Sequence, residues 1–269
     1  MDLQKLYSYN KGTILGSEIN FINSLQEKLI KSFDLENQKI NHNESIKHID
    51  KKIISNLNYF IKDSDPIIKS DNSSNEENSS IVIQNGRDYY LNNINKDDFF
   101  FSLLFNDENL LVNKIRHHNE YFKDDYIVNL NSIFLNSSFN CKLNSKKKLK
   151  LVLSHKNDLE KSTIYSKNFI TVEKDSKLIL IEKFEDKISS DSNIINYFDL
   201  KPGAQVTHLV IQNNDEDSNL LLTSHIKCNK NSNFKQFIFN SSNGFIRNHH
   251  YADLIGENAN VNLSGVFLA

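Results

Sequence analysis

The stretch Leu200-Lys201-Pro202-Gly203-Ala204-Gln205-Val206-Thr207-His208 shows the pattern on which the fold depends. An apolar residue is followed by polar turn residues, a small residue and then alternating apolar positions. The same form recurs at residues 172–180, 228–236 and 255–263, and a degraded copy occupies 143–151. The small residue lies at positions 176, 204, 232 and 259, which gives spacings of 28, 28 and 27 residues. Such a constant period indicates a repeat architecture.

Each period has room for two strands and two turns. Strands stacked at a constant period are typical of a parallel β-helix, because each coil buries its inward residues only against neighbouring coils. The repeat predicts one inward column made by Val172, Leu200, Cys228 and Ile255, and a second one made by Ile170, Phe198 and Ile226. A β-sandwich also contains many short strands, but it does not require so steady a spacing.

Residues 1–63 are predicted to form a small helical N-terminal region. Ser17 is a plausible N-cap, and apolar residues then recur at steps of three and four, at Ile22, Leu25, Leu29 and Phe33. A second stripe of this kind consists of Ile46, Ile49, Ile53, Leu57 and Ile61. Residues 64–80 follow as a predicted linker, rich in Ser, Asn and Glu.

Residues 81–125 are predicted to contain a lead-in hairpin and a short helix. The pair Asn85-Gly86 lies between apolar residues, which favours a tight hairpin turn, and Leu110, Leu111 and Ile115 suggest the helix. From Tyr126 onward we expect strands and turns only, so the β-helix core is assigned to 126–269. The chain has 7 Gly, but Asn tolerates left-handed turn positions and can replace glycine there.

Composition limits the functional class. With 32 basic and 34 acidic residues the net charge is −2, so non-specific electrostatic binding to nucleic acid is not expected. Two cysteines are too few for a disulfide framework, which favours a reducing compartment. No basic leader and no apolar run of membrane-spanning length is visible, so we expect a cytoplasmic protein with no membrane association.

No catalytic, cofactor-binding or metal-binding residue is assigned from the sequence. Cys141 and Cys228 fall on inward columns and are interpreted as core thiols. His208 aligns with Gln236, and the two could form a functional pair, although a hydrogen-bonded core histidine is the commoner outcome. His225 aligns with Tyr197 and Phe169 and is interpreted as part of an outward aromatic row. The neighbouring rings in His117-His118 and in His249-His250 point in different directions, so neither pair is expected to chelate a metal well. The run Lys146-Lys147-Lys148 is interpreted as a solvated turn.

Residues 245–269 closely resemble the core of the SufB/SufD family. In that core an Arg, a strand, the motif Leu-x-Gly-Glu-x-Ala and a second strand follow one another, as Arg247 and Leu254-Ile255-Gly256-Glu257-Asn258-Ala259 do here. Residues 81–87, 129–134 and 199–210 are similar to further family segments in the same order. The resemblance therefore covers most of residues 81–269.

The resemblance implies a right-handed parallel β-helix that is a non-enzymatic subunit of the SufBCD scaffold for iron–sulfur cluster assembly. SufB carries a cysteine near the position of Ala252 and Asp253, so its absence favours a SufD-like chain. The implied partners are a SufB-like paralogue, through the β-helix, and a SufC-like ATPase, through a C-terminal region that family members have beyond this point. We therefore expect a C-terminally truncated fragment whose core is incomplete and which alone holds no cofactor.

Two alternatives remain. A carbohydrate-active β-helix, such as a polysaccharide lyase, predicts an open groove lined by carboxylates with Arg or Lys, and a secretion signal. The second alternative is a solenoid that only mediates protein contacts. Failure of the chain to bind SufB would distinguish this alternative from the SufD-like assignment.

Overall fold

The computed structural model describes residues 3–32, 53, 66–71, 79–145, 147–160, 162–184, 190–214 and 217–268. The helical elements are α1 (Leu3–Asn10), η1 (Lys11–Thr13), α2 (Asn20–Ser32), η3 (Leu104–Asn106), α4 (Glu108–Tyr121) and α5 (Tyr126–Ile133). The strands are β1 (Ile68–Asp71), β2 (Ser79–Gln84), β3 (Asp88–Asn92), β4 (Phe99–Leu103), β5 (Ser137–Leu143), β6 (Lys148–Lys156), β7 (Thr163–Val172), β8 (Lys177–Phe184), β9 (Asp191–Leu200), β10 (Gln205–Gln212), β11 (Asn219–Cys228), β12 (Asn233–Asn240), β13 (Ile246–Leu254) and β14 (Asn260–Phe267).

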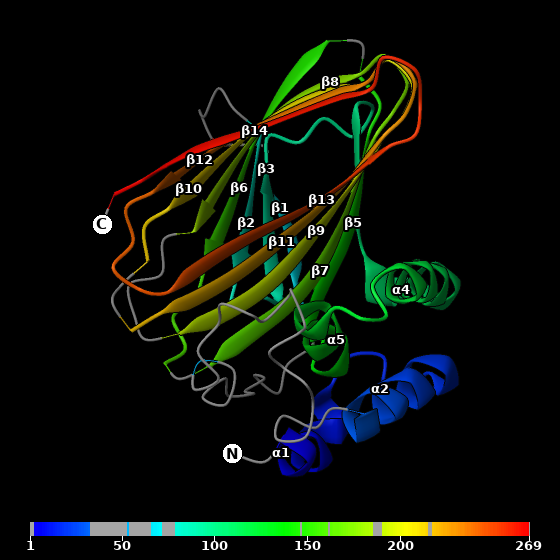
Figure 1. The fold of residues 1–269 in the computed structure, drawn as a ribbon, viewed down its shortest axis with the longest axis vertical. Coiled ribbons are helices and arrows are strands. Elements are labelled where there is room, and N and C mark those ends of the chain that lie inside the picture. The colour runs from blue at the N-terminus through cyan, green and yellow to red at the C-terminus, as the bar shows by residue number, and fades with distance from the viewer. Residues whose placement is uncertain are drawn as a thin grey trace.

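Two sheets build the molecule (Figure 1). The first has the order β1-β3-β2-β6-β8-β10-β12-β14 and the second the order β13-β11-β9-β7-β5-β4. From β5 onward successive strands alternate between the sheets, and each pairs in parallel with the strand two places further along the chain. This arrangement is a parallel β-solenoid, so the predicted fold class is confirmed.

The predicted stacking register is confirmed except at the last coil. Val172 pairs with Leu200 and Leu200 with Cys228, and Cys228 then pairs with Leu254 rather than with Ile255. The prediction for Ile255 is wrong because the turn between β13 and β14 has one residue more than the turn between β11 and β12. The prediction aligned the coils on their small residues, Ser232 and Ala259, so the extra turn residue shifted the expected partner of Cys228 from Leu254 to Ile255. The second column, of Ile170, Phe198 and Ile226, stacks as predicted.

The turns explain why the repeat works with so few glycines. The residue before each small marker has a positive φ: Asp175 at 60°, Gly203 at 76°, Asn231 at 57° and Asn258 at 58°. The marker's backbone N–H then donates to the carbonyl three residues earlier, as Ser232 does to Asn229 at 3.1 Å. The small side chain is buried at Ser176, Ala204 and Ser232, where a larger one would collide with the neighbouring coil.

Helices cover the outer face of the six-stranded sheet (Figure 1). Leu6, Ile30 and Ile127, from α1, α2 and α5, share an apolar cluster with Tyr165 of β7 and Leu221 of β11. The prediction that only strands follow Tyr126 is wrong, because α5 occupies the first eight residues. Asp125 caps this helix by accepting from the N–H of Val128 at 3.0 Å. Seven of its residues are buried, so it has no polar face to reveal a helical period.

The N-terminal predictions meet the structure in part. The first apolar stripe corresponds to α2, but this helix begins at Asn20, and Ser17 lies in the preceding turn rather than at the N-cap. The second stripe lies outside the described residues apart from Ile53, which packs against the cluster of α1, α2 and α5. The prediction that residues 64–80 form only a linker is wrong, because they include β1 and the first two residues of β2; residues 64–65 and 72–78 lie outside the described part.

The lead-in region follows the prediction closely. β2 and β3 form an antiparallel hairpin connected by residues 85–87, in which Asn85 and Gly86 both have positive φ, as a tight turn of the type I′ kind requires. α4 contains Leu110, Leu111 and Ile115. None of the helices in the described ranges combines the length and apolar character that spanning a membrane requires.

Candidate functional site

A buried polar layer crosses the interior of the solenoid. The Glu182 carboxylate of β8 is wholly buried, and its oxygens contact His155 Nε2 at 2.8 Å and His208 Nε2 at 2.9 Å. The side-chain amide of Asn196 donates to both carboxylate oxygens at 2.9 Å. Apolar clusters lie on both sides of this layer along the strands, with Leu180 and Phe198 in one and Phe184 and Val210 in the other.

Hydrogen bonds decide the charge state of Glu182. Burial is the largest influence and by itself raises the pKa, but the hydrogen bonds from His155 and His208 together with their charge lower the pKa well below the usual value of 4.5. Since Glu182 is ionised, His208 donates from Nε2, and its Nδ1 faces Gln236 Nε2 at 3.0 Å. The predicted alignment of His208 with Gln236 is confirmed, and its ring is a hydrogen-bonded core group.

Sequence reasoning missed Glu182 and Asn196. The signal was present in the alternation of β8, because Leu178 and Leu180 point inward and a strand brings every second residue to the same face. Glu182 therefore had to point inward as well. The layer is closed off from the groove described below, and we assign it a structural role.

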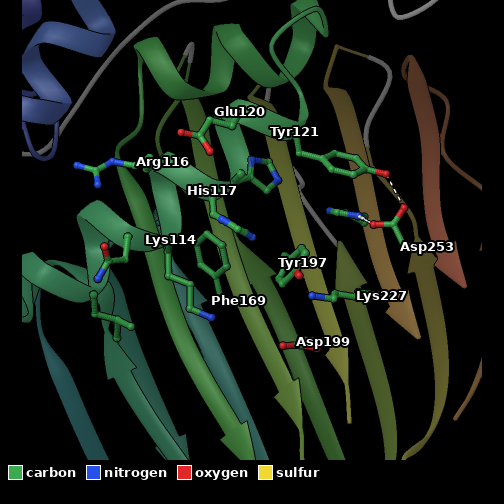
Figure 2. A pocket seen from close by; sticks show the side chains of 14 residues that line it. Lys114, Arg116, His117, Glu120, Tyr121, Phe169, Tyr197, Asp199, Lys227 and Asp253 are labelled. Atoms are coloured by element: carbon green, nitrogen blue, oxygen red, sulfur yellow. Dashed lines mark hydrogen bonds and ion pairs between the residues drawn. The ribbon is translucent and has the colours of Figure 1, made fainter. Parts of the chain in front are cut away.

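A groove of about 730 Å³ lies between α4 and the outer face of the six-stranded sheet (Figure 2). One wall is a face of α4, where residues three and four positions apart lie side by side. The floor and the other wall come from β7, β9, β11 and β13. The lining residues are Leu110, Asn113, Lys114, Arg116, His117, His118, Glu120, Tyr121, Phe169, Tyr197, Asp199, His225, Lys227 and Asp253.

The floor of the groove is an aromatic row. Phe169, Tyr197 and His225 occupy the same register position on β7, β9 and β11, with ring centroids 5.9 and 4.9 Å apart. Tyr121 of α4 stacks on His225 at 4.5 Å. The predicted outward row is thus confirmed, but α4 covers part of it, and Phe169 and His225 are buried rather than solvated.

Asp253 of β13 ties this row to α4. Its two oxygens accept hydrogen bonds from Tyr121 Oη and, at 2.8 Å, from His225 Nε2 (Figure 2). Burial, and then the hydrogen bond with Asp253, raise the pKa of Tyr121 to about 12. Burial lowers the pKa of His225 despite the opposing effect of Asp253. Neutral His225 therefore donates from Nε2, and its Nδ1 is an acceptor with no partner among the described residues.

Several further polar atoms of the groove have no partner in the described part of the chain. His118 is only 5% exposed, yet neither of its ring nitrogens is hydrogen-bonded. Burial, with Lys167 and His225 nearby, holds its pKa well below 6.5, so the ring is neutral. Asp199 Oδ2 accepts from Lys201 Nζ at 2.8 Å, but its buried Oδ1 has no partner.

The other sequence candidates lie apart from this groove. Cys141 and Cys228 are buried free thiols on the inward columns, and burial raises the pKa of Cys141 to about 12. His249 stacks near Tyr251 at 4.6 Å, whereas His250 follows the inward Asn196 and Ser224 in register. Lys146 lies outside the described residues. Across the described ranges no three His, Cys, Asp or Glu side chains are grouped so as to hold a metal ion.

His117 and His118 both line the groove, His117 exposed and His118 buried. No sequence pattern indicated Lys114, Asp199 and Lys227 as lining residues. Strand alternation could have placed the last two on the outer face beside Tyr197 and His225, but nothing in the sequence located α4 above them.

The fold defines the class of protein, a parallel β-solenoid with a helical layer on one sheet. Residues 153–269, from β6 through β14, match the family model described as SUF system FeS cluster assembly, SufBD core domain. This part of the chain is therefore similar to the SufB/SufD core domain, and the match connects it with iron–sulfur cluster assembly. No curated protein and no solved structure matches it. The resemblances at 81–87 and 129–134 lie outside the matched residues and stay predictions.

Proposed function

We propose that the chain is a SufD-like, non-catalytic subunit of a SufBCD-type scaffold in the cytoplasm. The observation that carries this proposal is the SufBD core match, which covers the solenoid from β6 through β14. The iron–sulfur cluster is the cargo that the complex assembles, and the chain by itself holds no cofactor. Its partners are a SufB-like paralogue and a SufC-like ATPase.

The state of the cysteines supports a SufD-like rather than a SufB-like role. Both cysteines of the chain are buried, and burial raises the pKa of each thiol. The thiolate is the form that attacks sulfur and binds metal, so neither side chain is suited to receive sulfide or iron. On β13, where the resemblance places the SufB cysteine, this chain has Ala252 and Asp253.

The last described coil has an apolar edge that the described residues leave uncovered, and a SufB-like partner or a further coil would cover it. Within the described ranges, β13 and β14 each pair with a strand on one side only. Large apolar side chains are exposed on this coil, with Leu254 at 55%, Phe267 at 59% and Leu268 at 55%. An open edge with apolar side chains can accept a strand from another chain, whose backbone groups complete the hydrogen bonds.

Coexpression tests the proposal. The tagged chain is produced with SufB-like and SufC-like proteins, and the purified material is analysed by size-exclusion chromatography with light scattering. We expect one complex that contains all three proteins. If the chain elutes alone, the SufD-like assignment is wrong, and a solenoid serving other protein contacts takes its place.

Two matched variants test the surface. Phe267→Lys places a charge on the exposed edge coil, whereas Phe237→Lys changes a comparably exposed Phe on β12 within the stack. We expect Phe267→Lys to weaken the complex at least about tenfold, because a charge opposes burial at an apolar interface. Phe237→Lys should leave it intact. Equal behaviour of the two variants would exclude the edge coil as the interface.

One observation favours the carbohydrate-active alternative. The groove brings Glu120, Asp199 and Asp253 together with Lys114 and Lys227, as that alternative predicts. However, Asp253 is engaged by Tyr121 and His225, and Asp199 by Lys201. These carboxylates serve the packing of α4 and the strands, and the family match favours the scaffold.

A further inference from the structure

We propose that the groove between α4 and the outer face of the six-stranded sheet is a binding site for a nucleoside phosphate. The proposal names a ligand with a heteroaromatic base and an anionic phosphate. It rests on the geometry of this chain alone and is independent of the scaffold function.

The aromatic row provides the surface for a flat base. Tyr197 on the floor is partly exposed and Tyr121 is 53% exposed, so these two rings offer faces to a base, whereas Phe169 and His225 pack beside them as buried rings (Figure 2). Stacking on aromatic side chains is tolerant of base identity, because every base has a π face. The groove volume of about 730 Å³ suits a nucleotide-sized molecule.

The unpartnered polar atoms provide hydrogen bonds for the edge of the base. His225 Nδ1 and Asp199 Oδ1 are acceptors, and neutral His118 offers one donor and one acceptor, all without partners in the described part of the chain. His118 matters most, because it is 5% exposed and lines the groove. A buried polar group without a hydrogen bond is costly, so a ligand that has both donors and acceptors is favoured over an apolar one.

Two lysines supply the charge for the phosphate. Lys114 on α4 and Lys227 on β11 reach the groove from opposite walls (Figure 2). Neither forms an ion pair with a carboxylate of the described residues. Burial lowers the pKa of Lys114 and Asp199 offsets this only in part, and the Lys114 ammonium lies 5.3 Å from the centroid of the Phe169 ring, so an incoming anion would stabilise its charge further. An uncharged sugar would leave both ammonium groups unpaired, which is why we favour a phosphate.

Calorimetric titration of the full chain with adenosine 5′-monophosphate tests the proposal, with adenosine and ribose 5-phosphate as separate arms. We expect the monophosphate to bind more tightly than either part. Lys227→Met should weaken its binding about tenfold or more, the size expected for a charge-assisted hydrogen bond, and should leave adenosine nearly unaffected. His118→Phe preserves the ring but removes both nitrogens, and should weaken the monophosphate and adenosine alike.

Lys235→Met is the matched control, since Lys235 is an exposed lysine on the outer face of the other sheet. Circular dichroism and thermal unfolding establish that each variant is folded. The proposal is overturned if the monophosphate does not bind, or if Lys227→Met and Lys235→Met bind it with equal affinity. Binding of ribose 5-phosphate as tight as that of the monophosphate would exclude recognition of the base and also overturn it.

Discussion

Glu182 shows how one residue organises the interior of the solenoid. Its wholly buried carboxylate is shared by His155, His208 and Asn196. Removing one partner of a buried charged pair costs about 3–5 kcal/mol, because the other partners stay buried without compensation. We expect Glu182→Gln to lower the free energy of unfolding at pH 7 by about 3 kcal/mol in urea titrations. Glu257→Gln, at an exposed pair with Lys230, should change it by less than about 1 kcal/mol.

The same substitution has a pH signature. The pKa of Glu182 in the folded chain lies below its unfolded value near 4.5. Its contribution is therefore complete above pH 4.5 and is lost as the pH falls further. The difference in stability between the wild-type chain and Glu182→Gln should shrink below pH 4.5. A difference that stays constant down to pH 3 would contradict the assignment of an ionised Glu182.

At the scale of residues, the repeat predicted which side chains point inward, but it did not predict which polar side chains bond to one another. The alignments of His208 with Gln236 and of Cys141 with Ile170 follow from the strand period and are confirmed. Asn231 and Asn258 take left-handed turn positions, as expected of Asn in a chain poor in glycine. The partners of Glu182 come from both sheets, and no single repeat contains the information on which strands face each other.

At the scale of elements, Lys167 holds the junction of β7, α4 and α5. Its buried ammonium donates to Asn119 of α4 and Ser132 of α5. Burial, only partly offset by Asp125, lowers the pKa of Lys167 to about 7. The unfolded lysine has a pKa near 10.4, so the unfolded chain binds more protons above pH 7 and stability rises with pH.

The expected result is a rise of about 1.5 kcal/mol in the free energy of unfolding between pH 7 and 8.5 that Lys167→Met abolishes. Urea titrations of both proteins at these two pH values measure it. The difference between the two proteins reports mainly on Lys167, because the other groups that titrate between pH 7 and 8.5 are present in both. If both proteins show the same pH dependence, Lys167 does not change its charge state in this window.

Helices and strands were predictable where their own sequence carries a turn signal or an alternation of apolar and polar residues. The hairpin at Asn85-Gly86, the helix containing Leu110 and the strands of the repeat carry local signals that the structure confirms. α5 was missed because a helix buried on nearly all sides has no amphipathic period. The groove was missed for a related reason, since it depends on where α4 packs and not on any local pattern.

At the scale of the whole molecule, in-register stacking creates the buried polar layer and the floor of the groove. It brings Phe169, Tyr197 and His225 into one row on the outside and Asn168 and Asn196 into one row inside. The same stacking leaves the strands of the last described coil with a free edge, on which the proposed pairing depends. A chain of the same composition with another strand order would have neither the groove nor the polar layer.

Disulfide trapping tests this stacking most directly. Thr207 and Lys235 are exposed register partners on β10 and β12, whereas Asn262 lies one strand further on β14. Neighbouring strands are about 4.8 Å apart, within the range that a disulfide spans, and a second strand doubles the distance beyond it. After mild oxidation, peptide mapping under non-reducing conditions should find a cross-link in Thr207→Cys/Lys235→Cys and none in Thr207→Cys/Asn262→Cys. No cross-link in the first pair, or equal cross-linking in both, would contradict the solenoid.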